Sequence, residues 1–350
     1  MRSWQIVEFG RPLRVAEYAN PAPQGTEVLL KVDGCGVCHS DLHIWDGYFD
    51  LGGGKRFDVG ARGVNLPFTL GHEIVGTVAA VGPDATGVAV GDRRIAFPWI
   101  GCGACPTCAG GDENLCNNPR FLGTRYAGGY SDRVLVGHPR YLLEYGDVPS
   151  ALACLYACSG VTAYGALKKV GPLGAGQHVL AIGVGGVGMM GVAIARAMYD
   201  AEVIAVDVDP AKLEAARATG AHHAVDARAP DAVKQILKLT GGGAKGAIDF
   251  VGGPQTVKFG MDALARGGRL AIVGLFGGEL TMSLPLFPFR AISVIGSYVG
   301  NLAEMHELMA LVRTGKVKPV PYAIRPLDEV NVALDALKAG KITGRTVVTP

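Results

Sequence analysis

The sequence lacks any excess of charge of one sign and any run of basic residues. Lys and Arg together number 33 and Asp and Glu 31, which gives a formal net charge of +2. Without a basic tract, the composition gives no indication of a nucleic acid partner. Charged residues make up 18% and hydrophobic residues 49% of the 350 residues, which is typical of an ordinary soluble globular protein.

A secretory signal is also missing from the N-terminal segment. Met1 to Glu8 reaches its first acidic residue before any apolar core forms, so we expect a cytoplasmic location. The charge-free stretch from Val179 to Ala195 most resembles a membrane span, but five glycines interrupt it and it is barely long enough. Since a buried strand followed by a helix accounts for the same residues, we expect no membrane partner.

The chain contains no internal repeat, low-complexity tract or linker. A chain of 350 residues exceeds the size for which one hydrophobic core usually suffices, so we expect about two domains. From Gln5 to Phe97, short apolar runs alternate with Gly and Pro, which predicts an irregular β-rich region. Within it, the segment from Gly47 to Leu66 contains three consecutive glycines and is predicted to be a long loop at the rim of a site.

From about Gln177 the pattern changes to strands that alternate with helices. This alternation is typical of a parallel sheet covered by helices on both faces, so a second domain is expected to start near residue 155. Strands are predicted at 179–182, 203–206, 247–251 and 269–273, and helices at 189–199, 210–219, 231–239 and 255–265. Two further helices, at 304–313 and 327–339, and a last strand, at 345–348, are predicted beyond this region.

A glycine-rich turn joins the first strand of the second region to its first helix. The turn contains Gly183, Gly185, Gly186, Val187 and Gly188. Its glycines allow a tight bend and a close approach of a pyrophosphate to the helix N-terminus. Asp207 ends the next strand, where a carboxylate would bind the adenosine ribose hydroxyls and repel a 2′-phosphate, so NAD is favoured over NADP. The alternative is a glycine-rich crossover with a capping aspartate; Asp209 is expected to cap the helix that starts at Pro210.

The most specific signal is a cluster of four cysteines. Cys102, Cys105, Cys108 and Cys116 follow the spacing C-x2-C-x2-C-x7-C. Four thiolates complete a tetrahedral zinc site without an open position, which suits a structural ion. An iron–sulfur cluster is an alternative with similar ligands, and free buried thiols are another.

The stretch from Gly36 to His43 places a thiol, a hydroxyl, a carboxylate and two imidazoles within eight residues. A catalytic zinc needs three protein ligands and an open fourth position. Cys38 is one candidate ligand, and His72 is a second. Cys154 and Cys158 lie four residues apart in a helix-prone stretch, so spacing alone does not decide which of them is the third. The alternatives are a solvated turn for the stretch and a structural role for His72.

Together, these motifs resemble a zinc-dependent medium-chain alcohol dehydrogenase over essentially the whole chain. Segments 36–41, 71–73, the four-cysteine lobe, 158–164 and the glycine-rich turn occur in family order, and segments 98–99, 119–123 and 273–277 resemble the branch known from thermophilic archaea. The resemblance implies an α/β fold with an irregular β-rich, GroES-like catalytic domain at 1–154 and 295–350. It places a structural-zinc lobe at about 98–118 and a doubly wound Rossmann NAD-binding domain at 155–294.

The resemblance also implies two zinc ions per chain, NAD, and reversible hydride transfer between a primary or secondary alcohol and NAD. It selects Cys38, His72 and Cys158 as the ligands of the catalytic zinc. Glu73 matches a carboxylate that can approach the metal, and Asp41 matches the acid that orients the ligating histidine. Ser40 and His43 match the two protein ends of a proton relay.

Further positions match residues that contact the cofactor and the substrate. His39 and Arg345 match pyrophosphate contacts, and Lys212 matches a lysine near the adenosine ribose, with a solvated helix lysine as its alternative. The positions that match the family's nicotinamide-binding wall are Thr162, Val187, Val273 and Leu275. The pocket is matched by Phe49, Trp99, Phe121, Leu275 and Tyr298, whose bulk favours apolar or aromatic alcohols and aldehydes over sugars.

Two other readings remain: a polyol or sugar dehydrogenase of the same superfamily, and a non-enzymatic dinucleotide-binding redox sensor. Cys35 and Cys154 depart from the family pattern, and we expect them to be small buried hydrophobic residues rather than a redox pair or rival ligands. The family points to a homodimer or homotetramer, in which the edge strand at 291–296 pairs between subunits.

Overall fold

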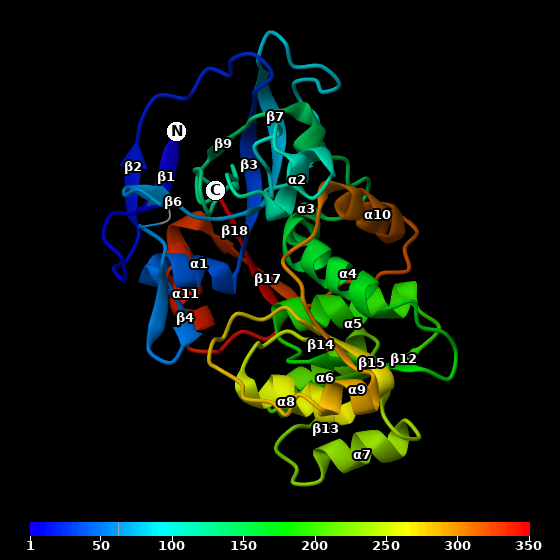
Figure 1. Ribbon diagram of the computed structural model, residues 1–350. Coiled ribbons are helices and arrows are strands. Elements are labelled where there is room, and N and C mark those ends of the chain that lie inside the picture. The colour runs from blue at the N-terminus through cyan, green and yellow to red at the C-terminus, as the bar shows by residue number, and fades with distance from the viewer. Residues whose placement is uncertain (62) are drawn as a thin grey trace.

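The computed structural model describes residues 1–61 and 63–350. A β-rich region and an α/β region lie next to each other, at the top and bottom of Figure 1, and the last strands of the chain return to the β-rich region. The fold is therefore of the α/β class with an irregular β-rich part, as the sequence predicts. The domain boundaries near 154 and 294 stay predictions, and the parallel sheet itself runs from His178 to Gly296.

The β-rich region is built on a seven-stranded sheet. Its strands follow the order β10-β8-β7-β3-β18-β17, and β9 also pairs with β3. They are β3 (Val28–Val37), β7 (Glu73–Val81), β8 (Arg93–Ala96), β9 (Arg133–Val136), β10 (Leu142–Leu143), β17 (Tyr322–Pro326) and β18 (Arg345–Thr349). In β3 the side chains of Val28, Leu30 and Val32 are buried, which fixes the strand in the core. Antiparallel pairing puts Gly36 of β3 opposite both Glu73 of β7 and Val347 of β18.

Two smaller sheets flank this one. The first, in the order β2-β1-β6, contains β1 (Arg2–Ile6), β2 (Arg14–Glu17) and β6 (Phe68–Thr69). The second is a hairpin of β4 (Tyr48–Gly52) and β5 (Lys55–Asp58). The predicted long loop from Gly47 to Leu66 is therefore wrong in its first half, because the three glycines adopt positive φ angles and form a hairpin turn.

The α/β region is a six-stranded parallel sheet, in the order β13-β12-β11-β14-β15-β16. Its strands are β11 (His178–Ile182), β12 (Glu202–Asp207), β13 (His223–Asp226), β14 (Ala244–Asp249), β15 (Leu264–Ile272) and β16 (Ser293–Gly296). This is the doubly wound order, in which ligands bind at the carboxyl ends of the strands where the order reverses, between β11 and β14. The glycine-rich turn leaves β11 at this point.

Helices cover both faces of the parallel sheet. They are α4 (Ser159–Val170), α5 (Gly186–Met198), α6 (Pro210–Thr219), α7 (Ala232–Leu239), α8 (Pro254–Ala263) and α9 (Leu286–Arg290). Successive side chains of β11 point to opposite faces of the sheet. Val179 and Ala181 pack in the core beside α5, whereas Leu180 and Ile182 pack in the core beside α8. The predicted helix at 255–265 ends two residues too late because Leu264 already adopts an extended conformation.

The remaining helices connect or cover the β-rich region. They are α1 (His39–Asp46), α2 (Pro106–Ala109), α3 (Ser150–Ala153), α10 (Leu302–Arg313) and α11 (Val330–Lys338), with short 3-10 helices η1 (Glu113–Leu115), η2 (Pro139–Tyr141), η3 (Cys154–Ala157) and η4 (Leu327–Glu329). Within residues 1–61 and 63–350, no single helix is long and apolar enough to cross a membrane, and the bent pair Ser150–Ala157 and Ser159–Val170 meets that test by length and composition only. The stretch from Val179 to Ala195 forms β11, a turn and most of α5.

Candidate active site and metal centres

Three potential metal ligands from distant parts of the chain converge in the β-rich region. Cys38 caps the start of α1, His72 precedes β7, and Cys158 lies between η3 and α4. One ligand atom from each lies within 4.8 Å of the others, and all three residues are buried. The φ and ψ angles of Cys158, −127° and −73°, interrupt the helical path after Ala157 and give this residue its own direction. The structure therefore brings Cys158, and not Cys154, into the cluster.

The donor atoms of this cluster fit a metal ion. His72 Nε2 is buried and has no hydrogen-bond partner, which would be costly unless a ligand completes its surroundings. The other ring nitrogen, Nδ1, lies 3.2 Å from Asp41 Oδ1. Two cysteine sulfurs and one imidazole nitrogen form the set that zinc accepts when one coordination position remains open.

The Asp41 carboxylate organises two of these ligands at once. It is fully buried; Oδ2 accepts hydrogen bonds from the Cys38 backbone N–H at 2.9 Å and from the Tyr130 hydroxyl at 2.8 Å. Burial lowers the pKa of His72, but the charges of Asp41 and Cys38 outweigh it and hold that pKa well above its usual value. The predicted position of Asp41 behind His72 is found, and Tyr130 is an additional contact that the sequence analysis missed.

The sulfurs of Cys38 and Cys158 shift each other's pKa values in opposite directions. A hydrogen bond from Cys158 lowers the pKa of the Cys38 thiol well below its usual value, and His72 lowers it further. The same hydrogen bond, together with burial, raises the pKa of Cys158. The site thus favours the thiolate form of Cys38, which is the form in which a cysteine binds a metal ion.

Glu73 and Arg345 form a buried ion pair next to the cluster. Arg345 donates to Glu73 Oε2, and the backbone N–H of Ser159 donates to Oε1 at 3.0 Å. Burial raises the pKa of Glu73, although Arg345 opposes this shift. Gly36 makes room for the pair, since a β-carbon there would lie 2.0 Å from Glu73 Oε2. The other end of Arg345 packs on the cofactor turn, where a β-carbon at Gly186 would lie 2.4 Å from Arg345 Cδ.

The four-cysteine lobe forms a second metal centre. Its four sulfurs lie within 4.8 Å of one another, and the distances from Cys108 Sγ to Cys105 Sγ and Cys102 Sγ are 3.5 and 3.9 Å. Four sulfurs at these distances surround one point, as in a closed tetrahedral zinc site. Arg140 from η2 pairs with the buried Glu113 of the lobe and ties it to the β-rich region.

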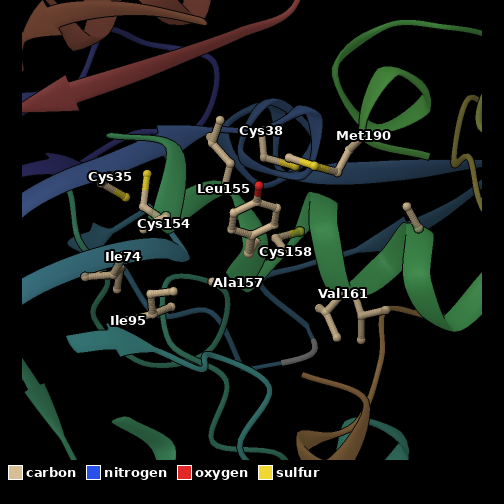
Figure 2. Close-up of a cluster of buried hydrophobic side chains, with 14 of the residues drawn as sticks. Cys35, Cys38, Ile74, Ile95, Cys154, Leu155, Ala157, Cys158, Val161 and Met190 are labelled. Atoms are coloured by element: carbon tan, nitrogen blue, oxygen red, sulfur yellow. The ribbon is translucent and has the colours of Figure 1, made fainter. Parts of the chain in front are cut away.

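Cys35 and Cys154 lie outside both centres. Figure 2 shows them on one side of Leu155, whereas Cys38 and Cys158 lie on the other. Both are fully buried in the main hydrophobic core, and burial raises the pKa of each thiol well above its usual value. The prediction that they are small buried hydrophobic residues agrees with these surroundings.

The predicted proton relay lies on α1, the helix that Cys38 caps. Ser40 is half-buried on its first turn, and His43 is half-buried one turn later. The ring of His43 stacks on Phe49 of β4 at a centroid distance of 4.7 Å. Burial lowers the pKa of His43, so its imidazole is neutral and able to accept a proton at neutral pH.

The cofactor turn has the geometry that its glycines predict. Gly183 has a φ of +80°, and a β-carbon at Gly188 would lie 1.9 Å from the Gly183 carbonyl oxygen. Asp207 accepts hydrogen bonds from the backbone N–H groups of Val184 and Val208, each at 2.8 Å. Asp207 is the last residue of β12, and its bond to Val184 places its carboxylate directly beside the turn. As predicted, Asp209 caps α6.

The other predicted cofactor contacts differ in their surroundings. Lys212 Nζ lies 3.8 Å from Asp209 Oδ2. Thr162 is buried on α4 and its hydroxyl has no hydrogen-bond partner, so a polar ligand would complete it. Val187 and Val273 are half-buried, whereas His39 and Leu275 are exposed.

Three of the predicted pocket residues form an aromatic cluster beside the metal ligands. Trp99 lies 5.4 Å from the ring of His72 and 5.4 Å from that of Phe121, and Tyr298 lies 6.1 Å from Trp99. The indole N–H of Trp99 donates to the Ala157 carbonyl at 3.0 Å, just before Cys158. Phe49 is separate from this cluster and packs on His43 and Phe57.

Comparison with known proteins agrees with this arrangement. Residues 24–147 match the alcohol dehydrogenase GroES-like domain, and residues 186–314 match the zinc-binding dehydrogenase family. An NAD-dependent alcohol dehydrogenase of Sulfurisphaera tokodaii is 40% identical, with 100% of both chains covered. The D-arabinose 1-dehydrogenase (NADP(+)) of Saccharolobus solfataricus is 31% identical, over 99% of this chain and 96% of that one.

A solved structure extends the comparison to the fold. The crystal structure of the alcohol dehydrogenase from the hyperthermophilic archaeon Aeropyrum pernix superimposes with a TM-score of 0.89 at 36% identity, covering 100% of both chains. The resemblance inferred from the sequence motifs is confirmed by these matches. The chain belongs to the family of zinc-dependent medium-chain alcohol dehydrogenases, in the branch that includes enzymes of thermophilic archaea.

Proposed function

We propose that this protein is an NAD-dependent zinc alcohol dehydrogenase that reversibly oxidises primary or secondary alcohols to aldehydes or ketones. The observation that carries the proposal is the position of Arg345. This side chain pairs with Glu73 beside the three metal ligands and packs on Gly186 at the start of α5. Because this one side chain touches both, we take the metal cluster and the glycine-rich turn as two walls of the proposed site.

The residues of this site have distinct tasks in the proposed reaction. When bound, zinc at Cys38, His72 and Cys158 supplies Lewis acidity for the alcohol oxygen, and NAD supplies the hydride acceptor. Asp41 fixes the orientation of the His72 ring through Nδ1. Ser40 would take the hydroxyl proton, and the neutral His43 would pass it to solvent.

We assign the remaining positions by their surroundings. Asp207 beside the turn would hold the adenosine ribose, while its charge disfavours NADP. Thr162, Val187 and Val273 would line the nicotinamide. Trp99, Phe121 and Tyr298 would form an apolar wall beside the metal, which suits aromatic or other apolar alcohols.

Metal analysis combined with an alcohol panel tests this function. We expect two zinc ions per chain, turnover of benzyl-type alcohols with NAD, and weaker activity with NADP. A clear preference for polyols or sugars would instead favour the runner-up, a sugar dehydrogenase such as the D-arabinose relative. Cofactor binding without turnover of any alcohol, together with a thiol count that changes on oxidation, would favour a redox sensor.

We also propose that the chain forms a homodimer or homotetramer through the edge of the parallel sheet. Strand β16 is the last strand in the sheet order, so one of its edges lacks a strand partner within the described residues. Exposed apolar side chains precede this edge, including Leu284, Leu286 and Phe289. Light scattering should give at least twice the 36.3 kDa chain mass, and a monomer would contradict the proposal.

A further inference from the structure

A side chain of the four-cysteine lobe reaches the predicted substrate wall. Asn114 lies in η1, between Glu113 and Cys116, and it is buried. Its Nδ2 donates a hydrogen bond to the backbone carbonyl of Tyr298, at 3.0 Å. The two residues are far apart in the sequence, so this contact joins the structural metal lobe to a separate segment of the chain.

The segment that Asn114 holds has a strained backbone. Val299, directly after Tyr298, has a φ of +41°, a conformation that β-branched residues rarely adopt. Such a conformation persists only where the surroundings enforce it. A second hydrogen bond to the same lobe follows Val299 in the sequence. Asn301 Nδ2 donates to Oδ1 of Asp112, which belongs to the lobe, at 3.2 Å. The lobe thus holds the chain on both sides of Val299.

The side chain of Tyr298 faces the active site. Its ring lies 6.1 Å from Trp99 and 6.5 Å from Phe121. Although 45% of the residue is exposed, desolvation and the nearby Cys158 sulfur raise the pKa of Tyr298 to about 12. Tyr298 therefore belongs to the aromatic cluster beside His72, and part of the residue stays accessible to a ligand.

We propose that Asn114 is a positioning residue for substrate specificity, which fixes the aromatic wall by holding the Tyr298 carbonyl on the structural-zinc lobe. Asn114 belongs to neither metal-ligand cluster, so its loss should leave the chemistry of a small alcohol intact. A displaced wall would instead weaken the fit of a bulky ring. This inference rests on the proposed alcohol dehydrogenase function.

Asn114→Asp tests the proposal with almost no change in side-chain volume. An ionised carboxylate cannot donate to a carbonyl oxygen and repels it. We expect both zinc ions to be retained, kcat for ethanol to stay unchanged, and KM for benzyl alcohol to rise. The ratio of kcat/KM for benzyl alcohol to that for ethanol should fall about 10-fold, as is typical when pocket contacts are lost.

The matched control is Asn117→Asp, which makes the same change at an exposed position of the same lobe and should leave the ratio unchanged. Asn301→Asp gives an independent test outside the lobe, because aspartate can still cap α10 but cannot donate to Asp112. It should shift the ratio in the same direction even if Asn114→Asp fails to fold.

An unchanged ratio in Asn301→Asp and in a zinc-replete Asn114→Asp would overturn the proposal, as would an equal loss of activity for both alcohols. Absence of turnover in the unmodified protein would instead contradict the proposed function itself, so the two failures are distinguishable.

Discussion

Replacing Cys38 with alanine is expected to remove the metal ion of the three-ligand cluster and to lower kcat/KM for alcohols by at least about 1,000-fold. The variant leaves His72 and Cys158 as the only two members of the described three-residue cluster. Two ligands do not hold zinc in a catalytic geometry, for which three protein ligands are usual. Zinc content per chain, measured beside the steady-state kinetics, should fall from two to one.

Cys35→Ala is the matched control for this variant. Cys35 lies three residues earlier, at the same strand end, and is fully buried, but its sulfur is outside the ligand cluster. We expect this control to keep both metal ions and its turnover, with a loss of about 1 kcal/mol in the free energy of unfolding. Full activity of Cys38→Ala, or loss of zinc from Cys35→Ala, would show that the ligands are assigned wrongly.

Replacing Gly188 with alanine should both destabilise the α/β region and abolish NAD binding. The added β-carbon would lie 1.9 Å from the Gly183 carbonyl oxygen, a separation that no rotamer change can relieve because both atoms are fixed by the backbone. The start of α5 would have to move away from β11, at a cost of about 3 kcal/mol in the free energy of unfolding. Thermal unfolding and NAD titration measure the two effects.

Gly185→Ala separates these effects within the same turn. A β-carbon at Gly185 meets no atom within 4 Å, and its φ of −69° suits any residue. The stability should therefore stay unchanged, whereas NAD should bind more weakly because the methyl group would enter the open space beside the turn, where the pyrophosphate is proposed to lie. If Gly188→Ala unfolds at the same temperature as the unmodified protein, the close packing of this turn is not what the structure implies.

The fold could be predicted where local signals agree with long-range packing. Helix α6 matches its predicted range, because Asp209 and Pro210 define its start and Gly220 lies just beyond its end. The β4–β5 hairpin was missed, since its strands are short and mostly exposed, with Gly52 as their one buried residue, so they give no signal of a buried strand. Its glycines pack on another loop, where a β-carbon at Gly52 would lie 2.6 Å from the Gly278 carbonyl carbon.

The site could be predicted only in part, because some of its residues are brought together by packing between distant segments. Residue type and spacing identified Cys38 and His72, but they left Cys154 and Cys158 equivalent until the resemblance and then the helix break at Cys158 separated them. Tyr130 behind Asp41 and Asn114 behind Tyr298 follow no motif. Each contact depends on how distant segments pack, and no local pattern in the sequence reveals that packing.

The pairing of β18 with β3 has a consequence for how the protein is made. Strand β3 leads into Cys38, and β18 begins with Arg345, which neutralises the buried Glu73. A buried carboxylate without its cationic partner is strongly unfavourable. We therefore expect the strands around Cys38 and His72 to reach their final form only after residue 345 has been synthesised. We expect the metal-binding pocket to mature after synthesis, although all three of its ligands lie in the first half of the chain.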